Sequence, residues 1–231
     1  LPEGDSGTDW RLFRYPAGST EPMEYGDGIE RFEPGRAFWM ITKNDFTMKT
    51  GGGSTVNTTE PFLLTLKSGW NDIANPWMFN INWTDRENPG NATLSPLYAY
   101  ENGWKIVSGS GTLEPWKGYS VKNMDSSDRI LYLHPPSTES AKTAVETSAP
   151  IWEVTVSATA GDAVDDINFF GVRAGASREW DPHDYPEPPP VGRYVAMSFP
   201  HDEWGMNPGH YTSDFRAPSD THTWDFILKT N

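Results

Sequence analysis

Residues 32–42 read Phe-Glu-Pro-Gly-Arg-Ala-Phe-Trp-Met-Ile-Thr, and residues 113–123 read Leu-Glu-Pro-Trp-Lys-Gly-Tyr-Ser-Val-Lys-Asn. Both stretches follow one pattern: an apolar residue, Glu-Pro, any residue, a basic residue, a small residue and an aromatic residue that begins an apolar run. The two glutamates, Glu33 and Glu114, lie 81 positions apart. This spacing predicts an internal pseudo-repeat, and the two stretches are called motif copy 1 and motif copy 2 below.

The residue types of the motif favour a turn that leads into a strand. Proline fixes φ and has no N–H group, so we expect Pro34 and Pro115 just before a strand or at the edge of a sheet. The small residues Ala37 and Gly118 are expected where the backbone approaches a neighbouring segment closely. We therefore interpret the motif as a proline turn that precedes a core strand.

Short alternating apolar runs between turn signals occur along the whole chain, and no window of eleven or more residues has a helical period. The Asn-Gly pair at 102–103 predicts a hairpin over residues 98–107. In the last expected strand, Trp224, Phe226 and Leu228 form the inward set. The expected strands are 10–15, 36–42, 62–66, 79–83, 129–134, 151–158, 167–172, 193–199 and 223–229. The sequence therefore predicts an all-β protein.

One segment interrupts these strands. Residues 137–149 are rich in Ser, Thr and Ala and contain almost no large apolar residue, which is typical of a linker. This predicts two antiparallel β-sandwich-like domains, a repeat-containing domain at 1–136 and a smaller one at 150–231.

Composition excludes several classes of partner. The 231 residues include 18 basic and 32 acidic ones, which gives a net charge of −14. Such a surface repels nucleic-acid phosphates and anionic membranes, and no apolar run is long enough to span a bilayer. The absence of cysteine excludes disulfides and thiol catalysis. We therefore expect neither nucleic-acid binding nor membrane insertion, and because residue 1 is not Met we expect the chain to be a piece of a larger polypeptide.

A resemblance to a known kind of module rests on residues 69–76, Gly-Trp-Asn-Asp-Ile-Ala-Asn-Pro, followed by Asn82-Trp83 and motif copy 2. In that order these segments resemble a module common in secreted multidomain proteins of Bacteroidota and related bacteria. The module is typically found near a C-terminal sorting domain of the type IX secretion kind.

The C-terminal part resembles a second domain of such proteins. The similar parts are Trp152, residues 165–171, residues 181–189 and the terminal Trp224-Asp225-Phe226. The resemblance implies an extracellular or cell-surface location. It also implies that the partner is the remainder of a larger polypeptide or a neighbouring surface protein, and it identifies no reaction.

Acidic residues gather in two loops of the C-terminal part. Hard carboxylate oxygens suit Ca²⁺, which takes six to eight oxygen ligands. The alternative is that these side chains are solvated or cap local backbone N–H groups. The candidate calcium ligands are Asp162, Asp165, Asp166, Asp181, Asp184 and Glu187.

Five tryptophans stand at turn-like or unpatterned positions: Trp77, Trp104, Trp116, Trp180 and Trp204. If they are exposed, their rings could stack on the faces of sugar rings in a glycan. The alternative is that they plug the ends of small β domains. An exposed coplanar pair would favour carbohydrate binding.

No catalytic constellation stands out in the sequence. Residues 108–111, Ser-Gly-Ser-Gly, form a flexible turn and not a nucleophile elbow. Four histidines match no zinc spacing and are expected at the surface: His183, His201, His210 and His222. We expect a non-catalytic extracellular module with a spacer, assembly or adhesion role. The alternative is a carbohydrate-binding module attached to a secreted hydrolase.

Overall fold

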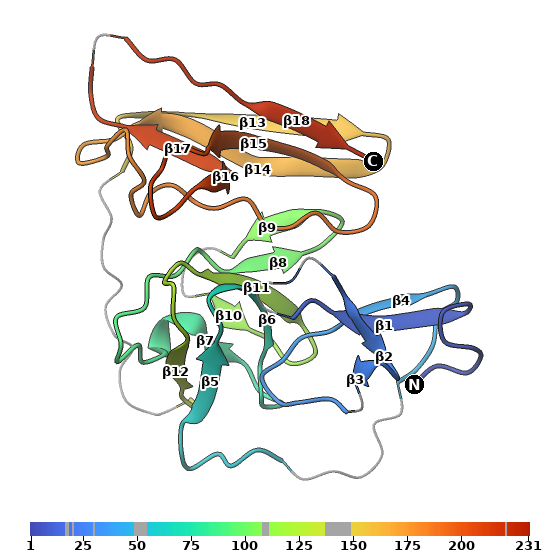
Figure 1. Ribbon diagram of the computed structural model, residues 1–231. Coiled ribbons are helices and arrows are strands. Elements are labelled where there is room, and N and C mark those ends of the chain that lie inside the picture. Colours follow the sequence, from blue (N-terminus) through green and yellow to red (C-terminus); the bar gives the residue numbers. More distant parts are fainter. Residues whose placement is uncertain are drawn as a thin grey trace. The chain divides into compact units, whose positions relative to one another are not determined.

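The computed structural model describes residues 1–16, 19, 21–29, 31–48, 55–107, 111–136, 149–219 and 221–231 (Figure 1). These residues form eighteen strands and one 3-10 helix, Trp83–Asp85, so the predicted all-β class is confirmed. Within the described ranges, no helix has the length and apolarity needed to cross a membrane.

The chain divides into two compact units. Unit 1 comprises Leu1–Leu94 and Gly109–Lys142, and unit 2 comprises Ser95–Ser108 and Thr143–Asn231. The sequence-based division differs, because it assigns residues 95–108 to the first domain. Hydrogen bonds give the physical reason, since the Tyr98 hydroxyl donates to the Pro186 carbonyl and the Trp104 indole to the Pro189 carbonyl, both at 2.9 Å. The expected linker at 137–149 lies outside the described residues apart from Ala149.

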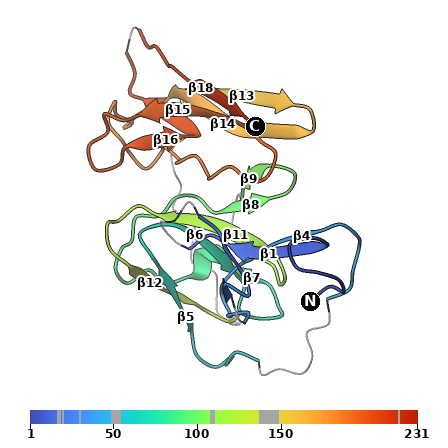
Figure 2. The ribbon, with the colours of Figure 1, turned by 45° about the vertical axis from the view of Figure 1, so that its right-hand side comes forward.

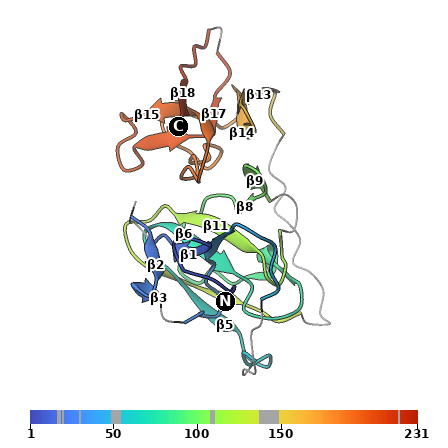
Figure 3. The same ribbon diagram turned by 90° about the vertical axis from the view of Figure 1, so that its right-hand side faces the viewer.

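Unit 1 is built from small sheets. One has the order β3-β2-β1-β4, formed by β1 (Trp10–Arg14), β2 (Met23–Tyr25), β3 (Gly28–Ile29) and β4 (Trp39–Thr42). The strand β5 (Phe62–Leu66) pairs antiparallel with β12 (Arg129–Leu133), as Figure 2 shows. The short strands β7 (Ile81–Asn82) and β10 (Thr112–Leu113) also pair. Finally, β6 (Gly69–Ala74) pairs antiparallel with β11 (Gly118–Asn123), and the two run together in Figure 3.

The central strand β6 lies between the two motif copies. On one edge, the Ala37 N–H of copy 1 donates to the Asp72 carbonyl (3.3 Å), and the Ala74 N–H donates to the Gly35 carbonyl (3.1 Å). On the other edge, Gly118 of copy 2 is the register partner of Ala74. A Cβ atom at Gly118 would lie 3.1 Å from the Ala37 Cβ. The small residue of the motif therefore allows a close approach, as the sequence predicts, whereas the full pseudo-repeat stays a prediction.

The Gly-Trp-Asn segment of β6 has a structural role that its sequence alone does not reveal. Asn71 is buried, and its side chain closes the β5–β6 turn with three hydrogen bonds. Its Oδ1 accepts the Lys67 N–H at 2.9 Å, and its Nδ2 donates to the carbonyls of Lys67 (2.9 Å) and Gly69 (2.8 Å). Ile73, two residues on, is fully buried. These residues hold the architecture together, which argues against a direct role in ligand binding.

Unit 2 contains the predicted hairpin, β8 (Tyr98–Tyr100) and β9 (Trp104–Ile106), with positive φ at Asn102 and Gly103. One sheet has the order β13-β14-β17, formed by β13 (Trp152–Ala160), β14 (Ala163–Val172) and β17 (Ser213–Arg216). The pairing of β14 with β17 is parallel, which an all-antiparallel expectation does not include. The other sheet has the order β16-β15-β18, formed by β15 (Val195–His201), β16 (Gly209–Tyr211) and β18 (Ile227–Thr230).

Aromatic packing links the two sheets of unit 2, because the rings of Phe170 in β14 and Phe199 in β15 lie 5.9 Å apart in edge-on contact. The expected inward set of the last strand is wrong for two of its three members. Phe226 and Leu228 are 55% and 57% exposed, and only Trp224 packs against the core. The reason is a shift of one position: Phe226 precedes β18, and within β18 the partly buried residue is Ile227, so Leu228 points to the other face.

Candidate functional site

Trp116, in the turn of motif copy 2, is the most exposed of the five candidate tryptophans. Its side chain is 70% exposed, and its φ is +64°. This left-handed backbone region suits glycine, because in an L residue it brings Cβ too close to the following carbonyl oxygen. The corresponding residue of copy 1 is Gly35, with a φ of +76°. The two turns therefore share a backbone conformation, and copy 2 places a tryptophan where copy 1 has the residue that this conformation favours.

The Trp116 turn is held from its base by a buried tyrosine. The Tyr119 hydroxyl donates to the Thr112 carbonyl (3.0 Å) and accepts the N–H of Glu114 (2.9 Å). Across the turn, Lys117 Nζ lies 2.9 Å from Glu114 Oε1 in an ion pair exposed to solvent. The Tyr119 bridge fixes the two sides of the turn, so the exposed indole is presented on a constrained backbone.

The residues around Gly35 and Trp116 explain why only motif copy 2 can carry a large side chain at this position of the motif. A Cβ atom at Gly35 would lie 2.5 Å from the Phe62 ring, which is closer than atoms of two side chains can approach. Trp116 projects into solvent instead. The backbone strain at Trp116 costs roughly 1–2 kcal/mol, and a side chain that is 70% exposed buries little apolar area to offset it. Strain of this kind is retained mostly at sites where it serves a function.

Two more apolar side chains are exposed on a segment that is hydrogen-bonded to the start of motif copy 2. Asn75 Nδ2 donates to the carbonyls of Phe79 (2.7 Å) and Leu113 (2.8 Å), which joins the segment after β6 to the start of motif copy 2. Met78 is 65% exposed and Phe79 is 37% exposed. We call Trp116, Met78 and Phe79 the Trp116 patch. Sequence reasoning gives Met78 no role, and its only signal is an apolar residue directly after a turn.

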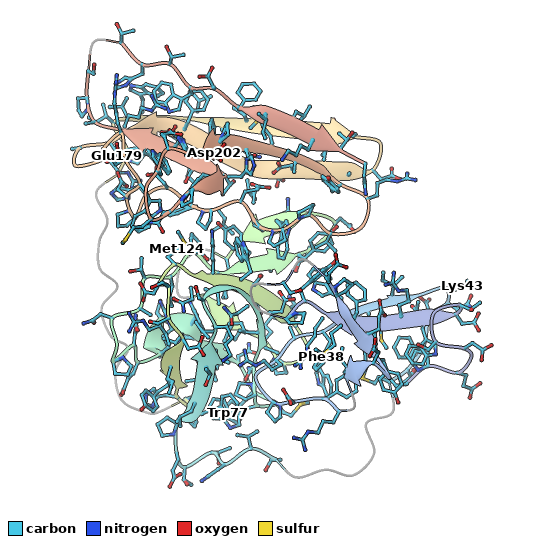
Figure 4. The ribbon with its side chains drawn as sticks, viewed as in Figure 1. Phe38, Lys43, Trp77, Met124, Glu179 and Asp202 are labelled. Carbon is cyan, nitrogen blue, oxygen red and sulfur yellow. The ribbon has the colours of Figure 1, made fainter. Side chains whose placement is uncertain are left out.

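A buried tryptophan supports the patch. Trp77, labelled in Figure 4, is 4% exposed and stacks on the Phe79 ring with centroids 5.7 Å apart and an interplanar angle of 13°. It also meets the Phe62 ring edge-on at 6.3 Å, and its indole N–H donates to the Asn57 carbonyl at 3.1 Å. Trp77 therefore acts as the core plug that the sequence analysis offers as an alternative, and it fixes the ring of Phe79.

The other candidate tryptophans are mostly enclosed. Trp204 is 3% exposed, and Trp104 and Trp180 are partly buried. Trp204 stacks on the ring of His201 at a centroid distance of 3.5 Å, and Trp104 is hydrogen-bonded through its indole to Pro189. Among the residues that the structure describes, the five tryptophans do not form an exposed coplanar pair.

Two candidate calcium ligands act instead as caps of the backbone. Asp181 accepts the N–H groups of Ser177 and His183, both at 2.8 Å. Asp184 is buried and accepts the N–H groups of Phe215 (3.0 Å) and Asp181 (2.9 Å). Burial raises the pKa of Asp184 to about 8, and the neighbouring charge of Asp181 contributes. Both side chains thus use their oxygens in local structure.

The remaining acidic candidates are dispersed. Asp162 is exposed, and Asp166 forms an ion pair with Lys105, whose Nζ lies 2.6 Å from Asp166 Oδ1. Asp165 is 6% exposed and accepts the Met197 N–H. Glu187 Oε2 is buried and has no hydrogen-bond partner in the described part of the chain. Across those same residues, no three His, Asp or Glu side chains gather in a group that could hold a metal ion.

One histidine expected at the surface is buried. His201 is 6% exposed, with Nδ1 2.8 Å from Glu203 Oε1 and Nε2 3.0 Å from Asp214 Oδ2. Burial alone would lower its pKa, but the hydrogen bonds and charges of the two carboxylates exceed that effect and raise it. Asp214 also binds Arg216 at 2.9 Å. This network lies within unit 2 and stabilises it. Neither spacing nor composition identifies it, because Asp214 and Arg216 lie on β17, whereas His201 ends β15.

Comparison with known proteins finds no similar protein. No family model matches the chain, no curated protein matches it, and no solved structure matches it.

Proposed function

We propose that this chain is a non-catalytic binding module of a larger secreted or cell-surface bacterial protein, and that the Trp116 patch is its contact surface for assembly or adhesion. One observation carries the proposal. Trp116 is 70% exposed at a backbone conformation that favours glycine, and the corresponding residue of motif copy 1 is glycine.

The chemistry of the patch fits a protein partner. Trp, Phe and Met are enriched in the buried centres of protein–protein interfaces, and a tryptophan there often contributes a large share of the binding energy. The rigid base formed by Tyr119 and Trp77 lowers the entropy that the patch would lose on binding. The exposed Lys117–Glu114 pair lies at the rim, where charged side chains select partners and add little affinity.

The extracellular setting rests on the resemblance of residues 69–76 and motif copy 2 to modules of secreted proteins. The acidic composition is compatible with that setting and with repulsion of nucleic acids. The partner would then be the remainder of the polypeptide or a neighbouring protein at the cell surface.

Site-specific photo-crosslinking in the producing cells tests this proposal. A photoreactive benzoylphenylalanine in place of Trp116 is expected to yield a discrete protein adduct on illumination. The matched control places the same group at Met206, which is 95% exposed in unit 2 and outside the patch. Adducts at neither position, or the same adducts at both, would remove the assembly role.

Carbohydrate binding is the second candidate, and the same tryptophan supports it. The indole of Trp116 is accessible, and the carboxylate of Glu114 and the ammonium group of Lys117 stand three residues apart beside it. Such polar groups orient a sugar ring stacked on an aromatic face. A glycan array and a polysaccharide pull-down, each with Ca²⁺ and with chelator, test it. Saturable binding that Trp116→Ala abolishes would replace the assembly role with this one.

A further inference from the structure

Unit 2 contains a partly open cavity that is independent of the Trp116 patch. It holds about 390 Å³ of atom-free space, which includes solvent at its mouth. The hairpin β8–β9, the start of β14, the proline-rich segment before β15 and β15 itself supply its walls. The lining side chains that matter here are Tyr100, Trp104, Asp165, Glu187, Arg193 and Tyr194.

Two aromatic rings form a corner of this cavity. The Tyr100 and Trp104 rings lie 5.4 Å apart at an interplanar angle of 82°. Hydrogen bonds tie the hairpin to the proline-rich segment, since Trp104 Nε1 donates to the Pro189 carbonyl and Tyr98, behind Trp104, donates to Pro186. A Cβ atom at Gly103 would lie 2.6 Å from the Val164 carbonyl, so the turn of the hairpin packs directly on β14. The aromatic corner is therefore rigid before any ligand binds.

Two carboxyl groups, those of Glu187 and Asp165, line the same cavity as the two aromatic rings. Glu187 Oε2 is buried and receives no hydrogen bond from the described residues. Asp165, which also lines the cavity, uses Oδ2 to accept the Met197 N–H at 2.6 Å. Burial raises the pKa of both carboxyl groups, and the charge of Asp165 raises that of Glu187 further. A buried acid without a donor or counter-charge is costly, so an additional positive group would stabilise the site.

The two basic side chains described near the cavity, Lys105 and Arg193, do not supply that charge. Lys105, on the hairpin, is paired with Asp166. Arg193 lines the cavity but is an exposed residue, and its charge does not offset the raised pKa of Glu187. A metal ion fits poorly, because calcium requires six to eight oxygens and the wall offers two carboxylates beside aromatic rings.

We propose that this cavity binds a small organic ammonium ion, with its charge facing Glu187 and Asp165 and its carbon atoms against the rings of Tyr100 and Trp104. Aromatic faces attract ammonium groups through their quadrupole, and a carboxylate at the same site adds a direct charge interaction. The cavity is small and open at its mouth, so it suits a small ion that keeps part of its surface in solvent. The ion can be a primary ammonium, which also donates to Glu187 Oε2, or a methylated one, which fills the aromatic corner.

Titration of the whole chain, followed by the indole N–H signal of Trp104 in a nitrogen-15 spectrum, tests the proposal. The two probes are methylammonium and tetramethylammonium chloride, and the controls are sodium chloride and the neutral tert-butyl alcohol. We expect a saturable shift of the Trp104 signal with at least one ammonium probe and none with the controls. Methylammonium alone would indicate hydrogen bonding to the acid, and tetramethylammonium alone would indicate the aromatic corner; either result supports the site.

Two variants test whether binding depends on the charge of Glu187 and not merely on an intact fold. Glu187→Gln keeps the shape of the side chain and is expected to lower the affinity at least about tenfold. Asp202→Asn removes an exposed acid of the same unit, marked in Figure 4 with Glu179, and is expected to leave the affinity unchanged. Binding to the unsubstituted chain should also tighten as pH rises and Glu187 ionises. No saturable shift with either ammonium, an equal shift with tert-butyl alcohol, or full affinity in Glu187→Gln would overturn the proposal.

Discussion

Replacing Trp116 by glycine should not destabilise the protein, although it removes a large aromatic side chain. The φ of +64° at this position costs an L residue roughly 1–2 kcal/mol, which glycine does not incur. Glycine has its own entropic cost in the unfolded chain, roughly 0.5–1 kcal/mol relative to alanine. Because the tryptophan is 70% exposed, its removal loses little buried apolar area.

The comparison with alanine isolates the strain. Trp116→Ala removes the same indole but keeps the strained φ, so we expect it to be less stable than Trp116→Gly by up to about 1 kcal/mol. For a chain of this size a difference of 1 kcal/mol corresponds to roughly 2–4 °C in Tm. Urea unfolding and calorimetry of the two variants measure it.

A control in the same turn shows whether the greater stability of glycine over alanine is specific to position 116. Lys117 is exposed and its φ is not positive, so glycine there should be less stable than alanine by roughly 0.5–1 kcal/mol. The reasoning is refuted if Trp116→Gly is less stable than Trp116→Ala by the same margin as in the Lys117 pair.

Three further outcomes concern the framework. Gly35→Ala should destabilise unit 1 by more than about 1 kcal/mol in urea unfolding, because it adds strain and a Cβ 2.5 Å from Phe62; an unchanged midpoint would contradict this. Asn71→Ala should cost about 2–4 kcal/mol by the same method, since three hydrogen bonds are lost in a buried position, and a loss below 1 kcal/mol would show that water replaces them. Because the pKa of His201 is raised in the folded state, its contribution to folding stability is fully present below the unfolded pKa of 6.5 and is lost as pH rises through the folded pKa. His201→Gln should therefore reduce this loss of stability, which urea midpoints measured across pH would show. His210 has the opposite sign, because burial and a nearby lysine lower its pKa, so its contribution to stability is lost as pH falls. His210→Gln should therefore flatten the loss at low pH, and the same pH dependence in both histidine variants would contradict the assignment.

Local sequence patterns predict those strands that are encoded by their own alternation of apolar and polar residues. The expected strand 62–66 coincides with β5, and the Asn-Gly pair correctly places the hairpin of β8 and β9. The sequence analysis gives no strand for β6, since Asn71 and Asp72 are poor strand formers and only their partners in the two motif copies hold them extended. Likewise β16 and β17 are short and polar, and their pairing with distant strands decides their structure.

The candidate site could be predicted only in part, because the sequence does not show which of the five tryptophans are exposed to solvent. Residue type alone does not distinguish Trp116 from Trp77, since both are tryptophans near turns. In the structure, Trp116 projects from a strained turn and Trp77 packs on Phe62. The signal that distinguishes them is a comparison within the chain, since the motif places Gly35 where copy 2 has tryptophan. Glu187 was expected in a calcium loop, and the cavity around it arises from the hairpin, which is distant in sequence.

The most direct test of the account measures partner capture by the unsubstituted chain and by Trp116→Gly in parallel, with the stability of both determined in the same buffer. The partner is the protein or glycan identified by crosslinking or by the array. We predict that the glycine variant loses capture while its free energy of unfolding stays equal or increases. Undiminished capture by a folded Trp116→Gly variant would contradict the claim that this strained, exposed tryptophan is the binding residue.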